Sequence, residues 1–181
     1  MIQVKEHANW HMHYRLEKRE GDINACKTPE ERLAFLENTK PYEVKEGEHN
    51  CLLNTGINEI WALVTGVFNA TIANRCFDNS NAKIGVGDSD TAADPAQEDL
   101  QADPNKLYKA MEANYPTSPP VSQKATFKAS FGSAEANWTW NEWVVKSTSG
   151  TPTDICLNRK VESLGTKSTG TWTLEVDLTL T

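Results

Sequence analysis

Two histidines near the start of the chain are the first residues whose type and spacing could bind a metal. His11 and His13 are two positions apart, so on an extended strand they would project from the same face. A metal site needs at least one further ligand, and His7 and His49 are the only other histidines. We therefore predict that the pair is the polar side of a strand and that the chain binds no metal.

A group of carboxylates further along resembles part of a calcium loop. Asp88, Asp90 and Asp94 have some of the required spacing. Ala92 and Ala93, however, stand where the EF-hand pattern needs another oxygen ligand and a turn glycine. We interpret the three aspartates as turn and capping residues.

Three tryptophans close together could form a platform on which a sugar ring stacks. Trp138 and Trp140 share one face of an extended strand, whereas Trp143 has the opposite parity. A β-bulge near Asn141 and Glu142 would bring all three to the same side. Aromatic residues at alternate strand positions are typical of the core of a β-sandwich, which is the interpretation we favour.

The chain contains none of the common catalytic or nucleotide-binding motifs. The segment Gly85-Val86-Gly87 is followed by Ser89-Asp90 rather than by a third glycine, and no βαβ unit surrounds it. There is no Walker loop, no Gly-x-Ser-x-Gly elbow and no His-Glu-x-x-His sequence. A triad assembled from distant positions would leave no such pattern, and nothing points to one. We predict no catalytic residue, no cofactor and no enzymatic activity.

The composition indicates one globular domain. The 181 residues carry a net charge of −7, which disfavours non-specific binding to nucleic acid or to an anionic membrane surface. No apolar run is long enough to span a bilayer, and the first residues do not form a secretory signal. Four cysteines lie far apart without a Cys-x-x-Cys pair; we expect free thiols, although the sequence leaves their pairing open.

The first fifty residues are predicted to form an extended N-terminal arm that carries a short helix. Large apolar residues alternate with polar ones over residues 10–16, as in a half-buried strand. A capping box at Thr28 and Glu31 and a proline at position 29 predict a helix that ends before Pro41. We expect the apolar face of the arm to pack against another chain or against a distant part of its own domain; the predicted partner-binding residues are Trp10, Met12, Tyr14 and Leu16.

Residues 51–181 are predicted to form the main domain, with helices inserted between strands. Residues 51–68 have the apolar spacing of a core-facing helix that ends at Gly66, with Trp61 on the buried face. Two Asp-Pro starts, at Asp94 and Asp103, predict two short helices within residues 94–114, followed by a rigid connector over residues 115–120.

The rest of the domain is predicted to be β-structure. The clearest strand is residues 171–180, where five large apolar residues alternate with Thr, Glu and Asp. Several strands separated by turns indicate a mainly β protein, an antiparallel, jelly-roll-like β-sandwich with short helical insertions. The predicted core residues besides Trp61 are Trp138, Trp140, Trp172, Leu174, Val176 and Leu178.

From about residue 50 onward the sequence resembles a family of small virion structural proteins of tailed bacteriophages. The resemblance is strongest in short blocks that contain no catalytic motif. These blocks are Leu52 to Trp61, Ile84 to Ala92, Asn105 to Met111, Tyr115-Pro116, Phe131 to Asn137, Trp140 to Trp143, Leu157 to Val161 and Gly165 to Lys167.

The resemblance implies a head decoration, or cement, protein. Such a protein would be made in the cytoplasm of the bacterial host and bind assembled major capsid protein subunits on the exterior of the virion, as a symmetric homo-oligomer such as a trimer. The alternative is a tail fibre or baseplate component, or a carbohydrate- or receptor-binding module.

Overall fold

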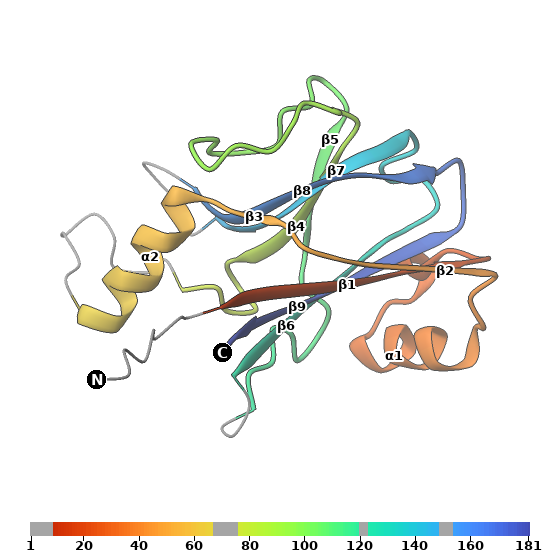
Figure 1. Cartoon of the computed structure of the whole chain (residues 1–181). Coiled ribbons are helices and arrows are strands. Elements are labelled where there is room, and N and C mark those ends of the chain that lie inside the picture. Colours follow the sequence, from red (N-terminus) through yellow and green to blue (C-terminus); the bar gives the residue numbers. More distant parts are fainter. Residues whose placement is uncertain (1–8, 67–75, 120–122, 149–153) are drawn as a thin grey trace, which may run out of the picture.

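The protein is an antiparallel β-sandwich with two helices (Figure 1). The computed structural model describes residues 9–66, 76–119, 123–148 and 154–181. The first sheet has the strand order β2 (Glu43–Glu48), β1 (Trp10–Arg19), β9 (Thr171–Leu180) and β6 (Lys124–Phe131). The second has the order β3 (Cys51–Leu52), β8 (Ile155–Thr166), β7 (Thr139–Ser147), β4 (Ala82–Gly87) and β5 (Lys106–Ala110). The predicted fold class is confirmed.

The last strand has the central place that its alternation predicted. β9 pairs with β1 on one side and with β6 on the other. Trp172, Leu174, Val176 and Leu178 are all buried in the main core. Trp140 meets the ring of Trp172 edge-on, with their centroids 4.9 Å apart, a contact that joins the two sheets.

The N-terminal segment is part of the sandwich and not a separate arm. β1 lies between β2 and β9, with Tyr14 opposite Val176 and Leu16 opposite Leu174. The strand predicted from the period-2 pattern is confirmed, and it pairs with the last strand of the same chain, because both strands present an apolar face of similar length. β1 and β2 therefore share one sheet with β9 and β6, and the predicted division at residue 50 does not separate two structural units.

Both predicted N-terminal and central helices are present. Helix α1 (Pro29–Asn38) begins with the predicted capping box, in which Thr28 accepts from the backbone N–H of Glu31 and the Glu31 carboxylate accepts from that of Thr28. A short 3-10 turn, η1 (Ile23–Ala25), precedes it. Helix α2 (Asn54–Thr65) ends at Gly66, whose φ of 65° is the left-handed conformation expected of a terminal glycine. The predicted start at residue 51 is wrong, because Cys51 and Leu52 form β3 and Leu53 is the N-cap of α2. The last two residues of the predicted helix, 67 and 68, lie outside the described part of the chain.

Residues 94–114 differ from the prediction of two short helices. Residues 88–105 form a long loop over the outer face of the second sheet, and residues 106–110 form β5. Leu107 and Tyr108 lie on opposite faces of this strand, because Leu107 pairs with Val86 and Tyr108 with Gly85. The aspartate before the first Asp-Pro caps a turn, since Asp94 accepts from the N–H of Ala96 at 2.8 Å. Leu107, Tyr108 and Met111 have helical spacing, but residues 106–110 form a strand because they pair with β4. The connector at residues 115–119 is ordered against β6 through a bridge between Thr117 and Thr126, and residue 120 lies outside the described chain.

The predicted bulge lies in β7. The register between β7 and β8 shifts between Trp140 and Glu142, so that Trp140 and Trp143 both face the core although they are three residues apart. Trp138 is half-buried and packs against the same core.

Candidate functional site

The residues predicted to bind a partner are mostly inside the molecule. Met12, Tyr14 and Leu16 are at most 3% exposed and belong to the main core. Their partner is the rest of the sandwich, which is the second of the two outcomes expected for the arm. The first outcome, contact of these three residues with another chain, is wrong. Trp10 differs because it is half-buried and lies at the open end of the sheet.

Helix α2 turns a different side toward the core from the one predicted. Its buried residues are Gly56 and Glu59, whereas Trp61 is 62% exposed and Val64 is 70% exposed. The prediction that Trp61 belongs to the core is therefore wrong. Gly56 explains the rotation, because a Cβ at that position would lie 2.4 Å from the carbonyl oxygen of Leu157 in β8. The helix therefore packs closest to the sheet at Gly56, which has no side chain.

The first turn of α2 is anchored to the same strand. Thr55 donates a hydrogen bond from Oγ1 to the carbonyl oxygen of Cys156 at 2.9 Å. The backbone N–H of Leu53, just before the helix, donates to the carbonyl of Leu157 at 3.1 Å. These contacts fix the helix at one end of the sandwich, where Figure 1 shows α2 projecting beside the start of β1 and the end of β9.

An apolar groove lies between α2 and the end of the sandwich; we call it the α2 groove. Its volume is about 450 Å³, within the usual range for ligand and peptide sites. Its walls come from the helix, from β1, β6, β8 and β9, and from two connecting segments. The lining residues are Trp10, Ile60, Leu63, Phe77, Ser118, Gln123, Lys124, Ala125, Phe127, Leu157, Leu178 and Leu180.

The α2 groove continues into an exposed apolar surface. Leu63 is 42% and Leu180 is 45% exposed, and Trp61 and Val64 stand next to the groove on the same helix. Soluble monomers rarely keep large apolar side chains together in water, and an exposed cluster of this kind marks an interaction site. The sequence contained the signal for it: the apolar residues of α2 extend around more of the helix than one buried face requires.

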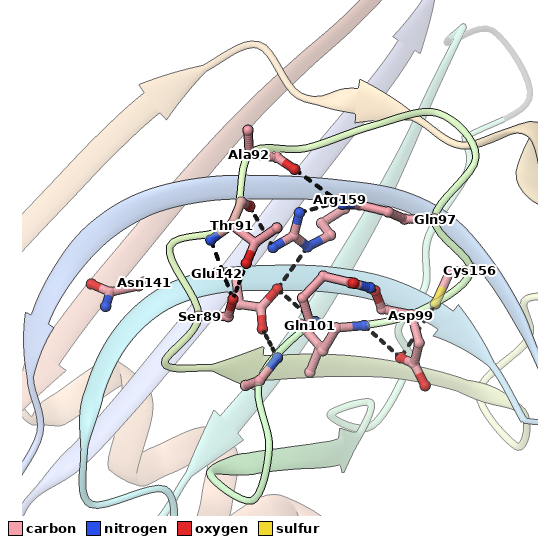
Figure 2. Close-up of polar contacts among 12 residues, drawn as sticks. Ser89, Thr91, Ala92, Gln97, Asp99, Gln101, Asn141, Glu142, Cys156 and Arg159 are labelled. Atoms are coloured by element: carbon pink, nitrogen blue, oxygen red, sulfur yellow. Dashed lines mark hydrogen bonds and ion pairs between the residues drawn. The ribbon is translucent and has the colours of Figure 1, made fainter.

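A second cluster is polar and lies beneath the loop of residues 88–105 (Figure 2). Glu142 and Arg159 form an ion pair in which both side chains are fully buried, with Nε 2.6 Å from a carboxylate oxygen. The Glu142 carboxylate also accepts from the backbone N–H groups of Gln101, at 3.1 Å, and Ala102, at 2.7 Å.

The other two nitrogens of Arg159 are bonded to the same loop. One donates to the side-chain oxygen of Gln97 at 2.8 Å, and the other donates to the carbonyl of Thr91 at 2.9 Å. Every charged atom of the pair thus has a protein partner, which is the condition under which a buried pair is tolerated. The cluster fastens the loop to the sheet and presents no free group to a ligand.

A neighbouring cluster surrounds Asp99. Burial acts to raise the pKa of this carboxyl, but hydrogen bonds from Lys146, at 2.6 Å, and from the Tyr108 hydroxyl outweigh it and hold the pKa below its ordinary value. Burial, together with the charge of Asp99, raises the pKa of the Cys156 thiol well above its ordinary value. Cys156 is therefore a protonated, buried thiol and not a nucleophile.

The remaining candidates have structural positions. Trp140 and Trp143 are fully buried, so the tryptophans of this segment form core and not a sugar-binding platform. His11 and His13 lie on the outer face of the first sheet, opposite Thr179 and Asp177. In the described ranges no three His, Cys, Asp or Glu side chains come together as a metal site. All four cysteines are free.

Comparison with protein-family models, with curated proteins and with solved structures finds no match in any of the three. Among the described residues no helix is long and apolar enough to cross a membrane. The family suggested by the sequence resemblance therefore stays a hypothesis.

Proposed function

We propose that this chain is a non-enzymatic structural protein of a bacteriophage virion, which decorates the capsid by binding assembled major capsid protein subunits. The α2 groove is the observation that supports this proposal. It places exposed large apolar side chains around a cavity at one end of a rigid sandwich, as a docking surface for another protein would. The resemblance of residues 50–181 to small virion proteins supplies the partner.

The rest of the described surface fits a binding role. The outer face of the first sheet carries cross-strand ion pairs, such as Lys124 with Asp177 and Lys128 with Glu175. These charged side chains make this face polar. The groove would hold apolar side chains of the capsid subunits, on the exterior of the shell. Several copies bound to neighbouring subunits, as a homo-oligomer or singly, would stabilise the assembled head.

Co-sedimentation with assembled capsid shells tests the proposal. The shells are those of the phage that encodes the chain, and its purified tails serve as the second particle. Leu63→Asp, inside the groove, and Trp61→Ala, beside it, should weaken binding to shells by about thirtyfold, the effect of losing a hot spot of about 2 kcal/mol. Leu33→Ala is the matched control, because Leu33 is 56% exposed on α1, away from the groove.

The outcomes separate the alternatives. Binding to shells that is lost in both groove variants and kept in the control supports decoration through the groove. Binding to tails alone would replace the proposal by the tail or baseplate alternative. Shell binding that is unchanged in Leu63→Asp and Trp61→Ala would exclude the groove as the docking surface.

A further inference from the structure

Strand β2 is an edge of the first sheet with a free side. It pairs only with β1 among the described strands, with Tyr14 opposite Gly47 and Leu16 opposite Lys45. The backbone N–H of His49 donates to the carbonyl of Met12, in the same register. Directly opposed residues alternate between bonded and non-bonded pairs in an antiparallel ladder, so Gly47 and Lys45 bond to β1. The peptide groups of residues 44, 46 and 48 consequently point away from the sheet.

The side chains along this edge are mostly charged, with one exposed apolar residue. Val44 is 41% exposed and lies on the same side of the strand as Glu46 and Glu48, and Tyr42, just before the strand, is 56% exposed. Charged side chains commonly limit pairing at an edge strand, and four of the six residues of β2 are charged. Val44 offers one apolar contact to an added strand, whereas the charges of β2 limit which strand can pair.

One contact marks where the free edge ends. Lys160, in β8 of the other sheet, donates from Nζ to the carbonyl oxygen of Glu48 at 2.8 Å. Among the described residues, the backbone groups on this side of β2 without a hydrogen-bond partner are therefore the N–H and C=O of Val44 and Glu46 and the N–H of Glu48. This is enough for a short added strand with five backbone hydrogen bonds.

The charges of β2 select the kind of strand. The Glu46 carboxylate forms an ion pair with Arg15, whereas Glu48 is exposed and has no ion pair among the described residues. β2 also contains Glu43, which pairs with Lys18, and Lys45, which pairs with Glu162, so three carboxylates and one lysine leave the strand with a net charge of −2. A second copy of β2 would bring these carboxylates against themselves, which disfavours self-pairing. A basic strand would be attracted.

We propose that β2 accepts one extended, basic segment of the protein partner as an added antiparallel strand. An apolar residue of that segment would lie opposite Val44, and Lys or Arg residues would lie opposite Glu46 and Glu48. This inference rests on the proposed function, since it describes a second contact of the same docking protein. The backbone bonds supply affinity, and the alternating side chains supply selectivity.

A synthetic peptide tests the edge without knowledge of the partner. The probe is Thr-Lys-Thr-Lys-Thr-Val-Thr, and the control peptide has Glu in place of each Lys. Binding of the probe should slow amide hydrogen exchange at Val44, Glu46 and Glu48, as measured by NMR, and the control peptide should not. If these three amides exchange at the same rate with and without saturating probe, the inference is wrong.

Two variants of β2 separate pairing from folding. Val44→Pro removes an N–H that does not bond to β1, so the sheet should survive while affinity for the probe falls at least about tenfold. Glu46→Lys should produce a similar loss by reversing charge, and Glu37→Lys, on exposed α1, is the control of equal charge change and should bind normally. Probe binding unaffected by both β2 variants would overturn the proposal.

Shell binding by the same variants distinguishes this inference from the proposed function. If Val44→Pro and Glu46→Lys bind shells normally while Leu63→Asp does not, the added strand is wrong and the docking function stands. If the unmodified protein binds no shells but binds the probe through β2, the edge is real and the capsid is not its target.

Discussion

Replacing Arg159 by leucine tests how the loop of residues 88–105 is held. The substitution leaves the Glu142 carboxylate, which is fully buried, without the one cation that pairs with it among the described residues. Removing one partner of a buried pair typically costs about 3–5 kcal/mol, because the other charge stays in a medium that solvates it poorly. The backbone N–H groups of Gln101 and Ala102 still stabilise the carboxylate in this variant. We therefore expect a loss of unfolding free energy near the lower limit, about 3 kcal/mol.

Glu142→Leu should be more damaging than Arg159→Leu. It leaves the buried guanidinium without its carboxylate and removes the acceptor of two backbone N–H groups. The N–H of Ala102 is buried, and leaving it without an acceptor costs about 1–3 kcal/mol; the N–H of Gln101 is only partly buried and costs less. The double variant Glu142→Leu with Arg159→Leu should cost clearly less than the sum of the two single changes, since neither charge remains to be stranded.

Urea unfolding followed by tryptophan fluorescence measures these differences in the free energy of unfolding. In thermal unfolding of a domain of this size, a loss of about 3–5 kcal/mol corresponds to a drop in Tm of about 6–20 °C. Arg15→Leu is the matched control: its guanidinium pairs with Glu17 and Glu46 at a side chain that is 40% exposed, so the loss should stay below about 1 kcal/mol. If Arg159→Leu destabilises the protein no more than Arg15→Leu, or if the two single changes simply add, the pair does not hold the loop as described.

Two further predictions concern buried positions. Gly56→Ala should destabilise the protein by about 2 kcal/mol or more in thermal unfolding, because the added Cβ would clash with the Leu157 backbone. The control Ala62→Gly, in the same helix, should cost only about 1 kcal/mol. Equal losses in the two variants would contradict the close approach of Gly56 to Leu157. Burial lowers the pKa of Lys167 to about 8, so between pH 8 and 10.5 the unfolded chain holds a proton that the folded chain has lost. Stability should therefore rise with pH in this window by about 1–3 kcal/mol relative to Lys167→Met, and parallel pH profiles of the two proteins would refute the assignment.

The sequence by itself determined the local structure of most elements. The capping box at Thr28, the terminal glycine at position 66 and the alternation of β9 all depend on residues close together in the chain, and each appears as predicted. The bulge in β7 was also readable, because the parity of the tryptophans on either side of it changes within one strand.

Tertiary structure decided which surfaces meet. The apolar face of β1 was visible, but its pairing with β9 depends on two segments at opposite ends of the chain. The rotation of α2, which exposes Trp61, depends on the backbone of Leu157 lying against Gly56. The loop of residues 88–105 has little helical periodicity of its own and is held by Glu142 and Arg159 on distant strands. Periodicity and caps report the neighbours along the chain, whereas the α2 groove and the free edge of β2 arise from contacts between segments that no local pattern connects.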